Sequence, residues 1–290
     1  MESVAEVVVQ LGGWATAADL VKATSRRALA GALRRGDVIR LARGIYGHPA
    51  LATDYGAAVS HHGVLSHTSA AAAWRLPLLV PPTVPHVTVP TNRAARSTQK
   101  AVLHWADLPK DDLRRRLTNL ERTVLDCART LPFGEALAVA DAALRTGRLN
   151  AEELQAAAFK MQGPGRPNAV RVAAAADARA ESFLESMARA VFLEAGLEDF
   201  EPQVVIDLGG RRIRVDLGER GIRLAVEAEG HEYHAAPPQF AADCRRYNEL
   251  VAAGWLVLLF TYQDIILDPA GVVATTRAVR SQRLGVPTNG

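Results

Sequence analysis

Two short apolar runs within residues 213–229 flank a Gly-Glu-Arg-Gly turn, which is the pattern of a β-hairpin. Asp216 ends the first run, and Glu227 and Glu229 alternate with apolar residues in the second. Side chains two residues apart on a strand project to the same face. We therefore expect Glu227 and Glu229 to point together, and Asp216 to join them if the hairpin pairs it near Glu227.

Helical and strand patterns surround this hairpin. Residues 181–196 predict an amphipathic helix that ends at a glycine cap, Gly196. Residues 240–253 predict a second helix, and the apolar run 254–260 predicts a buried strand. The expected order of elements is helix, strand, acidic hairpin, helix, strand.

The N-terminal fifty residues predict a winged helix-turn-helix, because three helical segments precede one hairpin. The expected helices and hairpin are 4–11, 17–22, 26–35 and 38–47. Thr16 and Ser25 are suitable N-caps for the second and third helices, and Gly36 ends the third. The hairpin turns at Arg43 and Gly44.

The third helix and the wing are rich in arginine, and Asp37 is the only acidic residue among them. The six arginines are Arg26, Arg27, Arg34, Arg35, Arg40 and Arg43. A helix of this kind enters a DNA major groove, while arginines of the wing contact phosphate or the minor groove. We expect these six residues to bind double-stranded DNA. The alternative is a winged helix that contacts another protein.

The fold class predicted for the chain is α+β multidomain. Residues 1–50 form the winged helix, 51–155 a middle α/β domain, 156–178 a linker with a connecting helix, and 179–284 an α/β/α core. Gly and Pro residues in 163–167, followed by an alanine run, are the signals for the linker.

Charge is divided unevenly along the 290 residues. Residues 1–180 carry a net charge of +8 and residues 181–290 a net charge of −5, within a total of +3. A basic half favours a phosphate backbone, and an acidic half is compatible with a site that holds a cation. The alternative is that such an imbalance has no function.

Hydropathy and cysteine usage indicate the cellular compartment of the protein. No apolar run approaches 20 residues, and the N-terminus lacks a basic-then-apolar leader, so we expect no membrane span and no secretion signal. The two cysteines, Cys127 and Cys244, lie far apart in the sequence. This usage suits a reducing cytosol, and we expect a cytoplasmic protein.

The acidic hairpin is the main candidate for chemistry. Converging carboxylates raise one another's pKa unless a cation lies among them, and their oxygens suit Mg²⁺ or Mn²⁺. His234, five residues after Glu229, is a candidate general acid or base. The alternative is a solvated acidic face. Among other histidines, His61, His62 and His67 cluster in sequence but offer no second ligand arm, so His67 is interpreted as a buried hydrogen-bonding residue.

The C-terminal order of elements resembles the PD-(D/E)XK nuclease core, and in particular the endonuclease-like family related to very-short-patch-repair endonucleases. The matching residues span about 90 positions: Leu184-Glu185-Ser186, Val215-Asp216, Glu227-x-Glu229-Gly230-x-x-Tyr233-His234, Phe240-x-x-Asp243-x-x-Arg246-x-Asn248-x-Leu250 and Gly254-Trp255. The resemblance implies a restriction-endonuclease-like fold and metal-dependent hydrolysis of a DNA phosphodiester.

The resemblance also implies roles for individual residues. Asp216 and Glu227 would hold Mg²⁺ or Mn²⁺, and Glu229 or Glu185 would complete the metal shell. Glu229 stands where the E-x-K form of the superfamily has a lysine and where the related family usually has an aspartate. His234 would then take over the role of the lysine, and Arg246 or Arg245 would neutralise the phosphate.

The N-terminal half resembles AbiEi-type antitoxins, which are DNA-binding regulators of abortive-infection toxin–antitoxin pairs. The matching segments are 13–46, Leu65-Ser-His-Thr-Ser-Ala-Ala-Ala-Ala-Trp74, Val84-Pro-His-Val-Thr-Val-Pro90, 120–128 and 140–145. This resemblance implies DNA binding by the winged helix and a cognate toxin as a second partner. It supports an alternative function, an antitoxin or repressor whose nuclease-like domain is inactive. The sequence specifies no oligomeric state.

Overall fold

The structure is a computed structural model that describes residues 3–11, 13–49, 53–92, 99–230 and 237–285. The protein is of mixed α/β type, and the described residues form three small sheets. The chain divides into two compact units. The first unit holds residues 1–75 and 79–127, and the second holds residues 76–78 and 128–290.

The first unit begins with three helices and a three-stranded antiparallel sheet of order β1-β3-β2. The helices are α1 (Val4–Gln10), α2 (Ala17–Ala23) and α3 (Arg26–Arg35), and the strands are β1 (Trp14–Thr16), β2 (Ile39–Ala42) and β3 (Ile45–Gly47). The three predicted helices and the hairpin are confirmed, whereas β1 was not predicted.

Capping explains where these helices begin and end. The hydroxyl of Ser25 accepts a hydrogen bond from the Ala28 amide at 3.0 Å, and Thr16 caps α2 in the same way. Gly36 ends α3 in the left-handed conformation, at φ +78°. Val8, Leu20 and other apolar side chains fill the core between the helices and the sheet.

The rest of the first unit surrounds a second small sheet of order β4-β5-β6. Strand β4 pairs with β5 antiparallel, and β6 pairs with β5 parallel. The elements are α4 (Thr53–Ser60), β4 (Val64–Leu65), α5 (His67–Ala73), β5 (His86–Val89), β6 (Val102–Trp105), α6 (Lys110–Arg115) and α7 (Leu120–Ala128). Val87 and Val89 pack on one face of the sheet with alanines of α4 and α5.

The second unit begins with helices that pack against one another. They are α8 (Phe133–Arg145), α9 (Ala151–Lys160), α10 (Arg166–Ala175) and α11 (Phe183–Glu194). The segment interpreted as a linker, 156–178, contains the end of α9 and all of α10, and α10 packs on α8 and α9. Asn168 fastens this segment to the end of α7, since its side-chain amide donates to the Ala128 carbonyl at 2.7 Å.

A four-stranded sheet of order β10-β9-β8-β7 follows. Its strands are β7 (Glu201–Asp207), β8 (Arg212–Glu219), β9 (Leu224–Glu229) and β10 (Leu256–Thr261). The helices after β9 are α12 (Pro237–Ala252), α13 (Tyr262–Leu267) and α14 (Pro269–Leu284). The first three strands are antiparallel, and β10 runs parallel to β9 after the crossover through α12. The predicted hairpin and both predicted helices are confirmed. The last strand is also present, but the prediction that it is buried was wrong: β10 lies at the edge of the sheet, where Leu256 and Leu259 are exposed.

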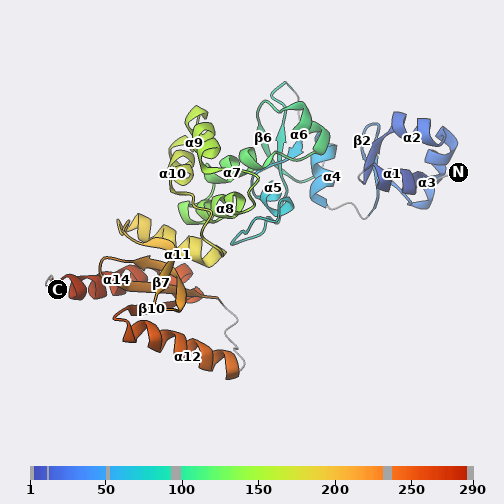
Figure 1. Cartoon of the computed structure of the whole chain (residues 1–290). Helices are drawn as coiled ribbons and strands as arrows, with labels where there is room; N and C mark the ends of the chain where they lie inside the picture. Colours follow the sequence, from blue (N-terminus) through green and yellow to red (C-terminus); the bar gives the residue numbers. More distant parts are fainter. Residues whose placement is uncertain (1–2, 12, 50–52, 93–98, 231–236, 286–290) are drawn as a thin grey trace. The chain divides into compact units, whose positions relative to one another are not determined.

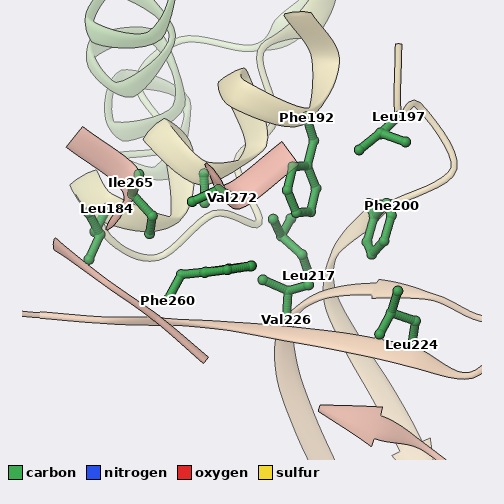
Figure 2. Packing of buried hydrophobic residues seen from close by; sticks show 11 residues of the cluster. Leu184, Phe192, Leu197, Phe200, Leu217, Leu224, Val226, Phe260, Ile265 and Val272 are labelled. Atoms are coloured by element: carbon green, nitrogen blue, oxygen red, sulfur yellow. The ribbon is translucent and has the colours of Figure 1, made fainter. Parts of the chain in front are cut away.

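Helices cover both faces of this sheet (Figure 1). Leu217, Leu224 and Val226 face α11, α13 and α14, and Phe192 of α11 packs among them (Figure 2). On the other face, Ala225 packs with Leu250 of α12. In the described part of the chain, no helix has the length and apolar character needed to cross a membrane.

Candidate functional site

The alternation of faces along β8 breaks at Asp216. Val215 belongs to the core beneath α12, and Leu217, two residues later, belongs to the core beneath α11. Regular pleating would put both on one face. The neighbouring strand is irregular at the same level: Val204 pairs with Val215 and Pro202 with Leu217, while Gln203 between them has φ +55°. Asp216 thus occupies a distorted point in the sheet rather than the end of a strand, since β8 continues to Glu219.

The Asp216 carboxylate is inserted into the β8–β9 ladder. The regular pairing of the two strands extends from Glu219↔Leu224 to Leu217↔Val226. At the next step, the Ala228 amide donates to Asp216 Oδ2 at 2.9 Å. A side chain therefore takes the place of a strand carbonyl, which fixes the carboxylate beside β9 and its two glutamates.

Glu227 and Glu229 of β9 face α12. Glu227 is only 5% exposed and forms an ion pair with the guanidinium of Arg246. The same guanidinium donates to the carbonyl of Arg214 at 2.9 Å. Glu229 accepts a hydrogen bond from the Tyr247 hydroxyl at 3.0 Å. Consecutive residues of α12 therefore hold the two glutamates.

Glu185 of α11 completes the acidic group from the other side of the sheet. It is buried, and its Oε2 accepts hydrogen bonds from Gln203 Nε2 at 2.6 Å and from the Glu181 amide at 2.8 Å. Its charge contributes to raising the pKa of Asp216. The left-handed residue Gln203 thus connects the sheet distortion to the glutamate of the helix.

Burial and mutual repulsion act on these acids. Desolvation, with the charges of Glu185 and Glu229, raises the pKa of Asp216 to about 6. Desolvation, with the charges of Asp216 and Glu229, raises the pKa of Glu227 to about 8, and Arg246 opposes this only in part. The ionised form of each carboxylate is therefore destabilised at neutral pH, and a bound cation would stabilise it.

The four predicted acids, Glu185, Asp216, Glu227 and Glu229, lie in one region, but no three of their carboxylates lie close together as a ligand group. Among the described residues, one group of three His, Cys, Asp or Glu side chains has ligand atoms that all lie within 4.8 Å of one another. That group consists of three histidines elsewhere in the chain. His234, the predicted general acid or base, lies outside the described residues. Arg246, the residue predicted to neutralise the phosphate, forms an ion pair with Glu227.

Sequence reasoning did not assign Gln203 or Tyr247 to this site. Tyr247 directly follows Arg246 on α12, and burial together with the charge of Glu229 raises its phenol pKa. No local signal identified Gln203, because its role depends on the distorted pairing of β7 and β8.

In the first unit, the six predicted DNA-binding arginines are all exposed on α3, β2 and the turn after β2. Arg35 pairs with Asp37 at 2.8 Å, so the one acid of the region partly neutralises one end of the surface. Arg27 and Arg34 of α3 are seven residues apart and therefore lie near one face of the helix.

Comparison with known proteins finds relatives whose names state no activity. No family model matches the chain. It is 36% identical over 154 residues to two proteins of Mycobacterium tuberculosis, the uncharacterized protein MT2308 of strain CDC 1551 / Oshkosh and the uncharacterized protein Rv2248 of strain ATCC 25618 / H37Rv. The match covers 52% of this chain and spans 57% of the length of each relative. Among solved structures, the RV2827C protein from M. tuberculosis aligns over 66% of this chain and 79% of its own, with 15% identity and a TM-score of 0.36, too low to carry an argument.

The raised pKa of Glu227 predicts that Glu227→Gln stabilises the protein at alkaline pH. The unfolded glutamate releases its proton near its ordinary pKa of 4.5, whereas the folded one holds it until about 8. The folded state therefore binds more protons across this window, and wild-type stability falls as pH rises through it. Glutamine does not titrate, so the stability of the variant should be close to that of the wild type at pH 5 and exceed it by up to about 4 kcal/mol at pH 8.5.

Urea unfolding at both pH values measures this difference. Glu194→Gln is the matched control, because Glu194 is an exposed partner of Arg171 in a surface pair that contributes less than about 1 kcal/mol. A stability difference for Glu227→Gln that is the same at pH 5 and pH 8.5 would contradict the assignment of a raised pKa.

Proposed function

We propose that this chain is a cytoplasmic, DNA-binding protein whose C-terminal region is a metal-dependent endonuclease of the PD-(D/E)XK type. The observation that carries the proposal is the pair of acids on adjacent strands, partly buried Asp216 and buried Glu227, whose pKa values are raised to about 6 and about 8. Perturbed carboxylates beside a basic residue are typical of catalytic sites. The mixed sheet with helices on both faces supports the same assignment.

The donor set fits a hard divalent cation. Mg²⁺ is commonly held by one or two carboxylates, with water and substrate phosphate completing its octahedral shell. Asp216 and Glu227 supply two carboxylates, and Glu185 and Glu229 lie close enough to influence their charge. The mutual repulsion of these acids favours binding of Mg²⁺ or Mn²⁺ among them. When bound, such an ion supplies Lewis-acid activation of the phosphate and of a water nucleophile.

The other residues of the site have roles that follow from their contacts. Arg246 is part-buried and already carries its charge beside Glu227, so it is suited to neutralise a phosphate that enters the site. The Tyr247 hydroxyl holds Glu229, and Gln203 holds Glu185, through hydrogen bonds of 3.0 and 2.6 Å. These bonds help to orient the two acids.

DNA binding is assigned to the N-terminal three-helix and hairpin region, read as a winged helix. The exposed arginines of α3 give a surface for the major groove, and Arg40 and Arg43 give a basic wing. Phosphate contacts of this type make binding fall steeply with salt. Double-stranded DNA is therefore the partner we propose for this region.

The test is incubation of the purified full chain with supercoiled plasmid and with mismatched duplex DNA. Parallel reactions contain Mg²⁺, Mn²⁺ or EDTA. We expect nicked or linear products with either metal and none with EDTA. Absence of cleavage of every DNA form in the presence of either metal would refute the nuclease.

A second candidate is a repressor or antitoxin whose nuclease-like domain is inactive. Two observations favour it: Arg246 already pairs with Glu227, and Glu229 occupies the position of the superfamily lysine. This candidate predicts tight binding to one operator, tested by gel shift on DNA upstream of its own gene, together with no cleavage in the plasmid assay. It also predicts binding to a cognate toxin.

A further inference from the structure

Three histidines from separate elements meet in the first unit. They are His67 at the start of α5, His86 at the start of β5 and His104 in β6. One ring nitrogen of each lies within 4.8 Å of the other two. His67 is buried, and the other two are partly buried. The sequence cluster of His61, His62 and His67 therefore contributes one member, and the other two come from distant strands.

Sheet register brings His86 and His104 together. In the parallel pair β5–β6, His86 lies opposite Val102, and Thr88 lies opposite His104. His86 and His104 thus occupy diagonal positions on one face, while Val87 and Leu103 belong to the apolar cluster on the other. Ser69 of α5 locks the strand to the helix, because its hydroxyl accepts a hydrogen bond from the His86 amide at 2.9 Å.

His67 is brought to the same place with backbone strain. Its φ of +51° lies in the left-handed region, which non-glycine residues seldom adopt and which costs about 1–3 kcal/mol. Its ring stacks on the His104 ring with centroids 3.6 Å apart. A strained conformation that aligns one imidazole with two others is a feature often found at ligand sites.

The spacing of the ring nitrogens suits a transition metal. Zn²⁺–N bonds of about 2.0–2.1 Å in a tetrahedral site separate neighbouring ligand nitrogens by about 3.3 Å. His86 Nδ1 and His104 Nε2 are 3.1 Å apart. His67 Nδ1 lies 3.0 Å from Ser66 Oγ, so coordination through Nε2 would leave Nδ1–H to donate to that hydroxyl. Such a bond is the usual outer-shell support of a metal-bound histidine.

A buried hydroxyl provides a second, independent observation. Thr88 is fully buried, shares the sheet face of His86 and lies opposite His104. Its Oγ1 has no hydrogen-bond partner among the described residues. Buried polar groups are nearly always satisfied, and an exception needs an explanation. A solvent molecule in the fourth coordination position of a metal would give this hydroxyl a partner.

We propose that His67, His86 and His104 form a binding site for a divalent first-row transition metal, and for Zn²⁺ in the first place. Three neutral imidazoles suit Zn²⁺ and do not suit Mg²⁺, which prefers oxygen ligands. The site is separate from the acidic group of the second unit and does not depend on the proposed nuclease. Bound metal would join α5, β5 and β6 and so stabilise the small sheet.

The test uses the full chain, purified without a polyhistidine tag and titrated with Zn²⁺ in competition with a chromophoric chelator. Excess Mg²⁺ is present throughout, and Asp216→Asn is measured in parallel to remove any contribution from the acidic group. We expect one Zn²⁺ per chain in both proteins. His86→Ala and His104→Ala should each weaken binding at least about 100-fold, while Ser66→Ala should weaken it about 10–100-fold. His48→Ala, a histidine outside the group, is the control and should bind as the wild type does.

X-ray absorption of the Zn²⁺-loaded wild type makes the test independent of how the variants fold. Three nitrogen ligands at about 2.0–2.1 Å would support the site. Fewer than three nitrogens would overturn it. So would the absence of stoichiometric binding in the wild type, or retention of wild-type affinity in folded His86→Ala and His104→Ala.

Discussion

Asp216→Asn is expected to abolish metal-dependent DNA cleavage, with a rate at least about 1,000-fold below that of the wild type. Loss of about 4 kcal/mol of transition-state stabilisation corresponds to such a factor, and a catalytic metal contributes several kcal/mol. Asparagine preserves the shape of the side chain but removes the charge that would hold the cation. Plasmid nicking in Mn²⁺, with calorimetric titration of Mn²⁺ into the protein, measures both consequences.

The structure supplies a matched control for this variant. Asp207→Asn changes an exposed aspartate at the end of β7, 3.7 Å from Arg212, and should leave cleavage unchanged. Misfolding is not expected in Asp216→Asn, because the substitution removes like-charge repulsion from a partly buried site. If Asp216→Asn cleaves DNA at the wild-type rate, Asp216 is not part of the metal centre.

Asp141→Ala is expected to destabilise the protein by about 3–5 kcal/mol, the cost of breaking a buried ion pair from one side. Asp141 of α8 is fully buried. Its two oxygens accept hydrogen bonds from Arg189 Nη2 of α11 at 2.7 and 2.8 Å, and Oδ1 also accepts from the Asp177 amide at 2.8 Å. Alanine would leave a guanidinium buried without its counter-charge. Urea unfolding of the full chain at pH 7 measures the loss.

Two further variants separate the ion pair from general damage. Asp199→Ala removes an exposed partner of Arg280 and should cost less than about 1 kcal/mol. The double replacement Asp141→Leu with Arg189→Met should recover much of the stability lost in Asp141→Ala, because apolar residues of similar volume often substitute well for a buried pair. A loss in Asp141→Ala no larger than that in Asp199→Ala would show that the pair does not hold α8 to α11.

The acidic site was predictable in part. The hairpin pattern predicted that Glu227 and Glu229 lie on one face, and both face α12. The contacts that define their chemistry were not predictable in the same way. Arg246 follows Glu227 by 19 residues, and their ion pair depends on how α12 crosses the sheet. The break in alternation at Asp216 depends on Gln203 of another strand.

The histidine group shows the same limit more strongly. His86 and His104 lie 18 residues apart in the sequence, and neither sequence neighbourhood contains a pair at metal-ligand spacing. Parallel pairing of β5 with β6 brings them together, and the register of that pairing is set by packing of Val87 and Val89 against the helices. The sequence cluster of His61, His62 and His67 therefore contains only one of the three residues.

The sequence by itself determined the local elements of this protein. Ser25 and Gly36 bound α3, Ser182 starts α11, and the alternation around Glu227 makes a strand, because capping and periodicity act over a few residues. The tertiary structure decided which side chains share a site. Register and packing between segments distant in sequence bury Glu227 beside Asp216 and bring the three histidines together. The desolvation of Glu227 and the short distances between the imidazoles, from which the proposed chemistry follows, are therefore properties of the tertiary structure.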